Sequence, residues 1–296
     1  MIEKKLHRIF FGFDSVEDPY VGYLETWKKE LPEYEIIHWN ADNLPMDNCY
    51  FSETMHKYKD HAFLSDYYRW WILKNYGGVY LDADIEILDG KKFNQIVIEL
   101  DDSKEFDTVI GIDHKDGGWY TAHSMAATAD SRMPTFMCEA YEKLGPISLW
   151  RRKIFYMMAP QFASLYFACN GHNVDGMGTS PFLLSPQIVA SVKIYPQEYF
   201  APMAPLIDVN TGAGGYQINA FTENSCLCHH FACSWHGTDS PYFKAAQKAR
   251  NSNILFHQLL ALEGKSTTVK RPAKIVRLIR TLPSLIQKLR AYLRSI

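Results

Sequence analysis

Apolar residues recur at three- and four-residue spacing between residues 62 and 75, which predicts an amphipathic helix. The apolar positions of this stripe are Leu64, Tyr67, Tyr68, Trp71, Ile72 and Leu73. Gly77 and Gly78 follow, and glycine commonly ends a helix because it tolerates positive φ. The next three residues, Val79–Leu81, are uniformly apolar and predict a short buried strand. The pattern therefore predicts a helix, a glycine turn and a strand in succession.

Two carboxylates, Asp82 and Asp84, come directly after this strand. Residues two apart point to the same side of an extended chain, and a loop can also aim both acids at one point. Adjacent carboxylates repel each other, and a hard divalent cation such as Mg²⁺ or Mn²⁺ relieves that repulsion; substrate phosphates then complete its shell. Because ligands of α/β sheets bind at the carboxyl ends of strands, the pair predicts a metal–diphosphate site.

Asp66 and Arg69 lie one turn apart on the predicted helix. With them, the segment from Ser65 to Asp84 reads S-D-x-x-R-x-x-x-L-x-x-x-G-G-x-Y-x-D-x-D without a gap. This arrangement resembles the sugar-nucleotide-binding region of the DXD glycosyltransferases related to yeast initiating mannosyltransferases and bacterial capsule and O-antigen transferases, which form glycosyltransferase family 32. The resemblance implies an α/β fold of the GT-A type, with a mixed central sheet, over residues 1–264.

The resemblance extends to two other segments of the chain. Leu6–Gly12 resembles the family's opening strand, which implies that Phe10, Phe11 and Gly12 lie beside the nucleotide base; Phe10 stands where tryptophan is usual. His229–Trp235 resembles a late H-H-x-x-x-S-W segment that closes over the diphosphate and can complete the metal shell. The site residues implied in this way are Phe10, Phe11, Gly12, Asp66, Arg69, Gly78, Asp82, Asp84, His229, His230, Ser234 and Trp235.

Each implied role follows the family. Asp84 is expected to bind Mn²⁺ or Mg²⁺ directly, with Asp82 on the ribose or on a metal-bound water and His229 or His230 assisting. Asp66 and Arg69 are expected at the donor sugar or the diphosphate, where an arginine fork suits phosphate oxygens. Ser234 and Trp235 are expected to donate hydrogen bonds to the departing diphosphate.

The function implied is a metal-dependent retaining glycosyltransferase. It would move a hexose or N-acetylhexosamine from a nucleotide-diphosphate sugar, with UDP the expected carrier, to a glycan acceptor that is lipid-linked in O-antigen or capsule biosynthesis. Two alternatives stay open: a non-catalytic nucleotide-sugar binding protein, and a D-x-D metal-dependent phosphatase, whose motif commonly stands nearer the start of its chain. The sequence fixes neither the sugar nor the acceptor nor a catalytic base.

Composition supports a packed enzyme: 47% of residues are hydrophobic and 14% aromatic. The net charge of −2 gives no whole-chain case for nucleic-acid binding. Charge is divided along the chain, however. From Gly264 onward there are nine lysines and arginines and no acidic residue, which leaves −11 for the rest of the chain.

Residues 265–296 also carry apolar residues at helical spacing, interrupted by Pro283. A basic amphipathic helical tail can lie in a membrane interface or pack on its own domain or on a second subunit of a homo-oligomer. No stretch approaches 18 uninterrupted apolar residues, and no signal-peptide pattern precedes the first strand. The expected location is therefore cytoplasmic and peripheral, on the inner face of the cell membrane.

Other candidate residues are less specific. Cys226, Cys228, His229, His230 and Cys233 place five potential zinc ligands close together, but no second knuckle is evident, so buried free cysteines are the preferred interpretation. The strand-like run Thr108–Ile112 precedes Asp113 and His123, which are candidates for contact with the acceptor.

Overall fold

The computed structural model describes residues 2–113, 120–145, 159–171, 183–207, 214–217 and 221–231. All of these belong to the compact unit formed by residues 1–256. Ser234, Trp235 and the predicted basic tail at 265–296 lie outside the described residues. Among the helices that are described, none has both the length and the apolar character needed to cross a bilayer.

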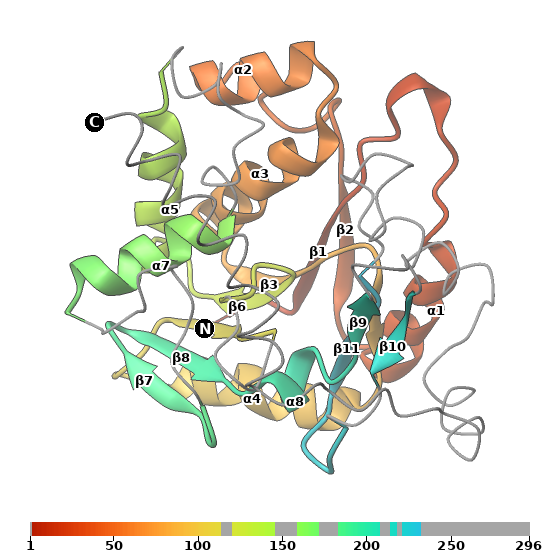
Figure 1. Ribbon diagram of the computed structural model, residues 1–296, viewed down its shortest axis with the longest axis vertical. Coiled ribbons are helices and arrows are strands. Elements are labelled where there is room, and N and C mark those ends of the chain that lie inside the picture. The colour runs from red at the N-terminus through yellow and green to blue at the C-terminus, as the bar shows by residue number, and fades with distance from the viewer. Residues whose placement is uncertain are drawn as a thin grey trace, which may run out of the picture. The chain divides into compact units, whose positions relative to one another are not determined.

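A mixed sheet forms the centre of the fold, with the strand order β2-β1-β3-β6-β5-β8-β7 (Figure 1). Its strands are β1 (Lys5–Ile9), β2 (Glu35–Trp39), β3 (Gly78–Leu81), β5 (Thr108–Gly111), β6 (Ser124–Ala127), β7 (Gln187–Val189) and β8 (Val192–Tyr195). β1 runs parallel to β2 and β3, and β5 runs parallel to β8. β6 is antiparallel to β3 and β5, and β7 is antiparallel to β8. The structure thus has the mixed central sheet that the resemblance implied.

Two antiparallel ribbons accompany this sheet. One pairs β4 (Ile85–Ile87) with β11 (Leu227–His229), and the other pairs β9 (Ala204–Ile207) with β10 (Gly214–Gln217). The first ribbon matters for the site because it joins the segment after β3 to a segment far along the chain.

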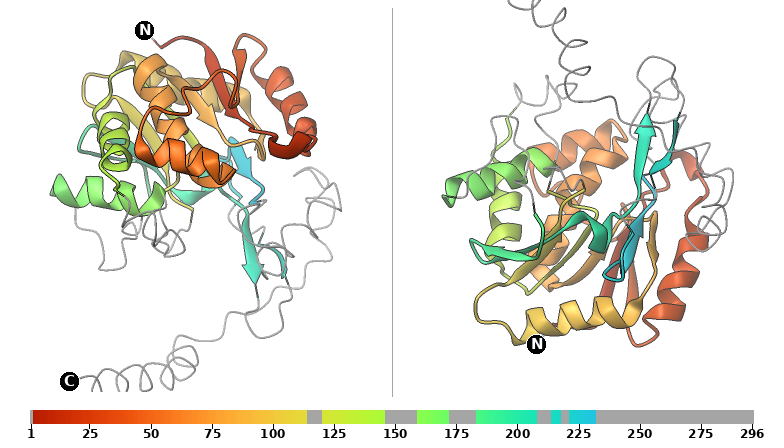
Figure 2. Two further views of the ribbon diagram at one scale, coloured as in Figure 1. Left: turned by 90° about the horizontal axis from the view of Figure 1, so that it is seen from above. Right: turned by 60° about the horizontal axis from the view of Figure 1, so that its bottom comes forward.

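Helices cover both faces of the central sheet (Figure 2). One face carries α2 (Tyr50–Lys57), α3 (His61–Tyr76), α5 (Arg132–Glu142) and α7 (Ala159–Cys169), and the other carries α1 (Val21–Glu30), α4 (Gly90–Asp102) and α8 (Gln197–Phe200). Alternate strand residues supply the two cores because successive side chains point to opposite faces. On β3, Tyr80 packs in the core with α3, while Val79 and Leu81 pack in the core with α1 and α4.

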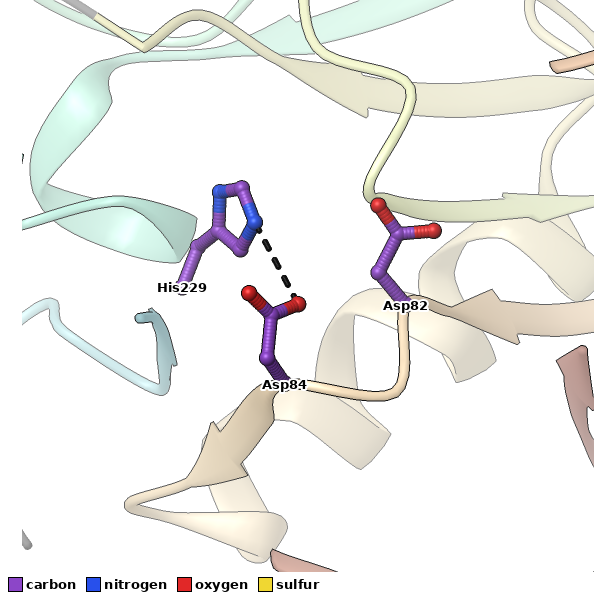
Figure 3. A group of neighbouring side chains, drawn as sticks. All are labelled: Asp82, Asp84 and His229. Atoms are coloured by element: carbon purple, nitrogen blue, oxygen red, sulfur yellow. Dashed lines mark ion pairs between the residues drawn. The ribbon is translucent and has the colours of Figure 1, made fainter. Parts of the chain in front are cut away.

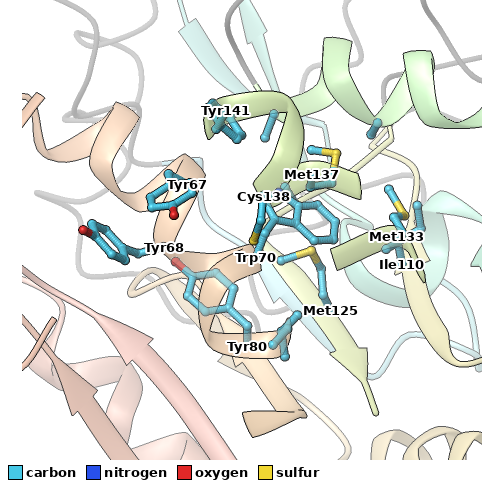
Figure 4. Packing of buried hydrophobic residues seen from close by; sticks show 14 of the residues in the cluster. Tyr67, Tyr68, Trp70, Tyr80, Ile110, Met125, Met133, Met137, Cys138 and Tyr141 are labelled. Atoms are coloured by element: carbon cyan, nitrogen blue, oxygen red, sulfur yellow. The ribbon is translucent and has the colours of Figure 1, made fainter. Parts of the chain in front are cut away.

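The core around α3 is rich in aromatic and sulfur-containing side chains (Figure 4). The helix predicted at 62–75 is confirmed, and it runs His61–Tyr76. Trp70, which the apolar stripe omits, is completely buried, whereas Trp71 is only partly buried. The difference arises because α3 packs against α2, α5 and the sheet together, so more than one of its faces is covered.

The glycine turn after α3 is required by its backbone and its neighbours. Gly77 has φ +62°, and a Cβ there would lie 2.8 Å from the backbone nitrogen of Ala129. The N–H of Gly77 donates to the carbonyl of Leu73 and closes the helix. Gly78 has φ +93°, and its Cβ would lie 3.0 Å from Nε2 of His7. These two glycines therefore let the chain turn sharply and pack closely as it enters β3.

His7 fastens this turn to the sheet. Its Nε2 donates to the carbonyl of Gly77 at 2.9 Å, while its Nδ1 accepts from the indole N–H of Trp39 at 3.1 Å. An imidazole that accepts at one nitrogen and donates at the other is neutral. Burial lowers the pKa of His7 to about 4, in agreement with that state.

Candidate active site

The two acids occupy a tight turn at the carboxyl end of β3. The N–H of Asp82 donates to the carbonyl of His123 at 2.8 Å, and the N–H of Ile85 donates to the carbonyl of Asp82 at 3.1 Å. The first bond continues the pairing of β3 with the β6 side of the sheet, and the second turns the chain into β4. Asp82 and Asp84 therefore lie at the sheet edge where the sequence predicted them.

The β4–β11 ribbon brings a histidine to these acids. Ile85 pairs with His229 in its register, and the N–H of His230 donates to the carbonyl of Asp84 at 3.2 Å. The side chains of Asp82, Asp84 and His229 converge (Figure 3). Each offers one ligand atom, and these atoms all lie within 4.8 Å of one another; Nε2 of His229 is 3.4 Å from Oδ1 of Asp84.

This donor set fits a divalent cation. Two carboxylates suit Mg²⁺ or Mn²⁺, and an imidazole favours transition metals. Burial raises the pKa of Asp82, although Arg69 opposes that rise. Burial disfavours the charged form of His229, but the carboxylates of Asp84, Asp82 and Asp113 together outweigh burial and raise the pKa of the imidazole. The cluster therefore holds protons more tightly than free side chains do, and a cation bound there would compete with those protons.

The neighbouring histidine faces a different partner. Nε2 of His230 lies 2.9 Å from Oε2 of Glu86, and both side chains are buried. The His230 ring also packs on Tyr23, with ring centroids 4.7 Å apart. Successive residues along an extended chain point to opposite sides. Of the two histidines in the predicted metal set, the structure therefore places His229 beside the acids and His230 beside Glu86.

A buried arginine links the acids to α3. Arg69 is 8% exposed, and its guanidinium lies 3.1 Å from Oδ1 of Asp66 and 3.5 Å from Oδ1 of Asp82. Its Nη1 donates to the carbonyl of Ala122 at 2.8 Å, and its Nε donates to the carbonyl of Ser65 at 3.0 Å. These backbone contacts fix the guanidinium between two carboxylates that lie on different elements.

Both of these carboxylates are held by further contacts. The hydroxyl of Tyr80 donates to Oδ1 of Asp82 at 2.7 Å. Oδ2 of Asp66 accepts from the N–H of Ala159 at 3.3 Å. Burial raises the pKa of Asp66 to about 6, against the opposing charge of Arg69. A carboxylate with so high a pKa is poorly compensated by the protein alone, which is typical of functional sites.

The predicted base-binding residues leave the sheet at the same edge. Phe10, Phe11 and Gly12 follow β1, which is parallel to β3. The N–H of Phe10 donates to the carbonyl of Trp39 at 3.0 Å. Gly12 has φ +59°, and the half-buried ring of Phe11 stacks on Phe13 with centroids 5.3 Å apart. Gly78, by contrast, begins β3 at the opposite end from Asp82.

The structure adds residues that the motifs did not single out. His123 was a candidate only for acceptor contact, and Phe231 was not considered; both rings pack on His229. Glu86 belongs to none of the predicted site residues, yet it pairs with His230. Cys226 and Cys228 are buried and free, as preferred, and the metal-ligand group found among the described residues contains no cysteine.

The region that carries most of these residues matches a known family. Residues 18–101 match the family model described as a glycosyltransferase sugar-binding region containing a DXD motif. The matched region contains Asp66, Arg69, Asp82 and Asp84. This match indicates a glycosyltransferase of the DXD type. Enzymes of this family transfer a sugar from a nucleotide-sugar donor.

Three solved structures, each described as a glycosyltransferase, align with a TM-score of 0.40. The PaToxG glycosyltransferase is 15% identical, and the alignment covers 54% of this chain and 65% of that protein's length. A glycosyltransferase involved in glycosylation of the major capsid of PBCV-1 is 8% identical over 83% of this chain and 98% of its own. The galactosyltransferase LgtC, solved with donor and acceptor sugar analogues, is 10% identical over 88% of this chain and 100% of its own. No curated protein matches the chain.

Proposed function

We propose that this chain is a metal-dependent retaining glycosyltransferase that moves a hexose or N-acetylhexosamine from a UDP-sugar to a glycan acceptor. The observation that carries the proposal is the meeting of Asp82, Asp84 and His229 at the carboxyl end of β3, beside the buried pair of Arg69 and Asp66. A cation-binding group next to a fixed guanidinium is suited to a diphosphate, and a buried carboxylate beside it is suited to sugar hydroxyls.

The three clustered side chains would hold Mn²⁺ or Mg²⁺. Such a cation would supply positive charge to offset the negative charge that develops on a leaving diphosphate. Arg69 presents a guanidinium that is already oriented by two backbone carbonyls, so little reorganisation is needed when charge develops nearby. Asp66 is ionised at neutral pH, since its pKa is about 6, and its carboxylate then accepts hydrogen bonds from donor sugar hydroxyls.

The proposed acceptor and the proposed location rest on the sequence of residues that the structure does not describe. The basic amphipathic pattern of residues 265–296 supports a lipid-linked acceptor at an anionic membrane surface, where each basic residue adds about 1 kcal/mol of attraction. Ser234 and Trp235 would donate hydrogen bonds to the departing diphosphate. Removing residues 265–296 should impair transfer to a membrane-embedded acceptor far more than transfer to a short soluble analogue; equal impairment would argue for a folding role.

The deciding experiment measures donor hydrolysis and transfer across UDP- and GDP-sugars with Mn²⁺ or Mg²⁺. Wild type is compared with Asp84→Ala and with Asp42→Ala, an exposed aspartate in the same family-matched region. Metal-dependent turnover of one donor, abolished only by Asp84→Ala, would support the proposal and name the sugar. A folded protein that neither turns over nor binds any nucleotide would defeat it.

Stereochemistry is tested separately. Retention is implied by the family resemblance, and no carboxylate nucleophile is evident from the sequence. Proton NMR of the freshly formed product shows its anomeric configuration before mutarotation. An inverted product would leave the transferase assignment standing but would refute the retaining mechanism.

A further inference from the structure

The imidazole of His229 is packed between two other rings. The centroid of the His123 ring lies 4.2 Å from that of His229, at an interplanar angle of 30°. The centroid of the Phe231 ring lies 4.1 Å from that of His229, at 42°. His123 and Phe231 are 6.3 Å apart, so each lies closer to His229 than to the other. We call these two side chains the aromatic cradle.

Packing matters here because the described residues offer no hydrogen-bond partner to Nδ1 of His229. A histidine that binds a metal through one nitrogen generally donates its other N–H to a carboxylate, a carbonyl or water, and this bond fixes the ring. Within the part of the chain that the structure describes, Nδ1 of His229 is buried and has no hydrogen-bond partner. The ring faces Asp84 only through Nε2. On the Nδ1 side, the rotation of the ring is therefore restrained by the cradle and not by a hydrogen bond.

Phe231 reaches His229 from an unfavourable backbone conformation. Its φ is +45°, in the left-handed region, which costs a non-glycine residue about 1–2 kcal/mol. Strain of this kind persists where the surroundings over-determine it, and it gathers at functional sites. The left-handed turn ends the extended run of β11 and leaves the Phe231 ring against a residue only two positions earlier.

His123 is anchored on the other side of the cluster. It is 6% exposed, its carbonyl accepts the N–H of Asp82, and its Nδ1 is bonded to the hydroxyl of Ser124 at 2.8 Å. Its backbone is thus bonded to that of Asp82, while its ring is bonded to Ser124 and packs on the imidazole. The cradle fixes His229 relative to both the Asp82 turn and the end of β11.

We propose that His123 and Phe231 are positioning residues that hold the His229 imidazole with Nε2 toward the acids. In this way they make the site prefer transition-metal cations such as Co²⁺ over Mg²⁺. Imidazole ligation favours transition metals, whereas Mg²⁺ is bound through oxygen. A cradle that aims the imidazole therefore matters for Co²⁺ and little for Mg²⁺. The inference rests on the proposed function only in taking this cluster as a cation site.

The test is a titration of the full chain with Co²⁺ and with Mg²⁺ in the absence of donor, followed by calorimetry and by the Co²⁺ visible absorption spectrum. Loss of an outer-shell contact typically weakens metal binding 10–100-fold. Phe231→Leu and His123→Ala should each weaken Co²⁺ binding in that range and alter the spectrum, while Mg²⁺ binding changes little. His123→Phe keeps a packing ring and should retain most of the Co²⁺ affinity.

A double-mutant cycle shows whether the effect passes through His229. In a His229→Ala background, Phe231→Leu should cause no further loss of Co²⁺ affinity, since coupled residues are not additive. A further loss, or equal weakening of Co²⁺ and Mg²⁺, would overturn the proposal. If His123→Phe weakened Co²⁺ binding as much as His123→Ala, His123 would be a direct contact and not a positioning residue.

Phe231→Gly is the control for effects on stability, because it removes the ring and relieves the left-handed strain. Its thermal stability without metal should equal or exceed that of Phe231→Leu, yet its Co²⁺ affinity should be as low. Recovery of Co²⁺ affinity in Phe231→Gly would contradict the role of the ring. Wild type that bound neither cation would defeat both this inference and the proposed metal dependence, whereas cation binding without donor turnover would defeat the proposed function alone.

Discussion

Replacing Asp66 by asparagine should stabilise the protein while abolishing its activity. Asp66 is 16% exposed at its side chain and lies 3.1 Å from the Arg69 guanidinium. Burial nevertheless raises the pKa of its carboxyl from 3.8 to about 6. Relative to the unfolded chain, the folded protein therefore favours the neutral carboxyl, which asparagine resembles in size and charge. The charged carboxylate of Asp66 is expected to serve donor binding at a cost in stability, so Asp66→Asn should raise stability and remove activity.

The magnitude and its pH dependence follow from this shift. When the folded pKa of a carboxyl is raised, the folded state binds its proton more tightly, so ionisation destabilises folding as pH rises from about 4 to 6. A shift of about 2 units corresponds to about 3 kcal/mol. The excess stability of Asp66→Asn over wild type should therefore be about 0.5 kcal/mol at pH 4 and about 3 kcal/mol at pH 7.5.

Urea denaturation in EDTA at these two pH values measures the difference. Asp42→Asn, at an exposed aspartate, is the control and should change the unfolding free energy by no more than about 0.5 kcal/mol. An Asp66→Asn variant that is less stable than wild type at pH 7.5, or whose excess stability is the same at both pH values, would refute the reasoning. Donor hydrolysis by the same preparation should be lost.

Three further predictions concern the frame of the site, and each is checked by urea denaturation. Gly77→Ala should lower the free energy of unfolding by about 1–3 kcal/mol, because Gly77 has a positive φ and a Cβ there would meet the backbone. The control Gly22→Ala, in α1, places its Cβ where nothing lies within 4 Å and should raise the free energy of unfolding by up to about 1 kcal/mol. His7→Gln should have a lower free energy of unfolding than wild type at pH 7. Burial lowers the pKa of His7 to about 4, so wild type loses stability as its histidine is protonated in the unfolded chain. The difference in unfolding free energy between the two proteins should therefore narrow by about 3 kcal/mol as pH falls from 6.5 to 4. Trp27→Phe removes the 2.7 Å indole bond to the carbonyl of Ile85 and should cost about 1–3 kcal/mol; an unchanged unfolding free energy would show that this carbonyl finds another partner.

The segment that carries most of the chemistry could be predicted from the sequence because its signals are local. Helical spacing of apolar residues, two glycines and an apolar run gave α3, the turn and β3 in the observed order. The acids could be placed at the sheet edge for the same reason. The prediction failed only in detail at Trp70, because a helix covered on several sides has no single apolar stripe.

The choice between His229 and His230 could not be predicted, because it depends on a register between distant strands. Both residues lie in one local motif, and nothing in their neighbours distinguishes them. The pairing of His229 with Ile85 directs one imidazole to Asp84 and the other to Glu86. The same pairing decides which rings surround His229, so the aromatic cradle was also beyond the reach of sequence patterns.

Charge balance gives these separate contacts a common explanation. Asp66 and Asp82 both lie beside the guanidinium of Arg69, and Asp84 lies with Asp82 and His229. Within the described part of this site, the three carboxylates therefore meet less positive charge than they need. Burial raises the pKa of Asp66 and Asp82 under these conditions, which shows that the arrangement is not optimised for the stability of the unliganded protein. A divalent cation between Asp82, Asp84 and His229 would supply the missing charge and lower the pKa of Asp82 through direct attraction. Cation binding should therefore raise the unfolding free energy and release protons together, and the gain in unfolding free energy should shrink as pH falls, because protons then compete with the cation for the same side chains.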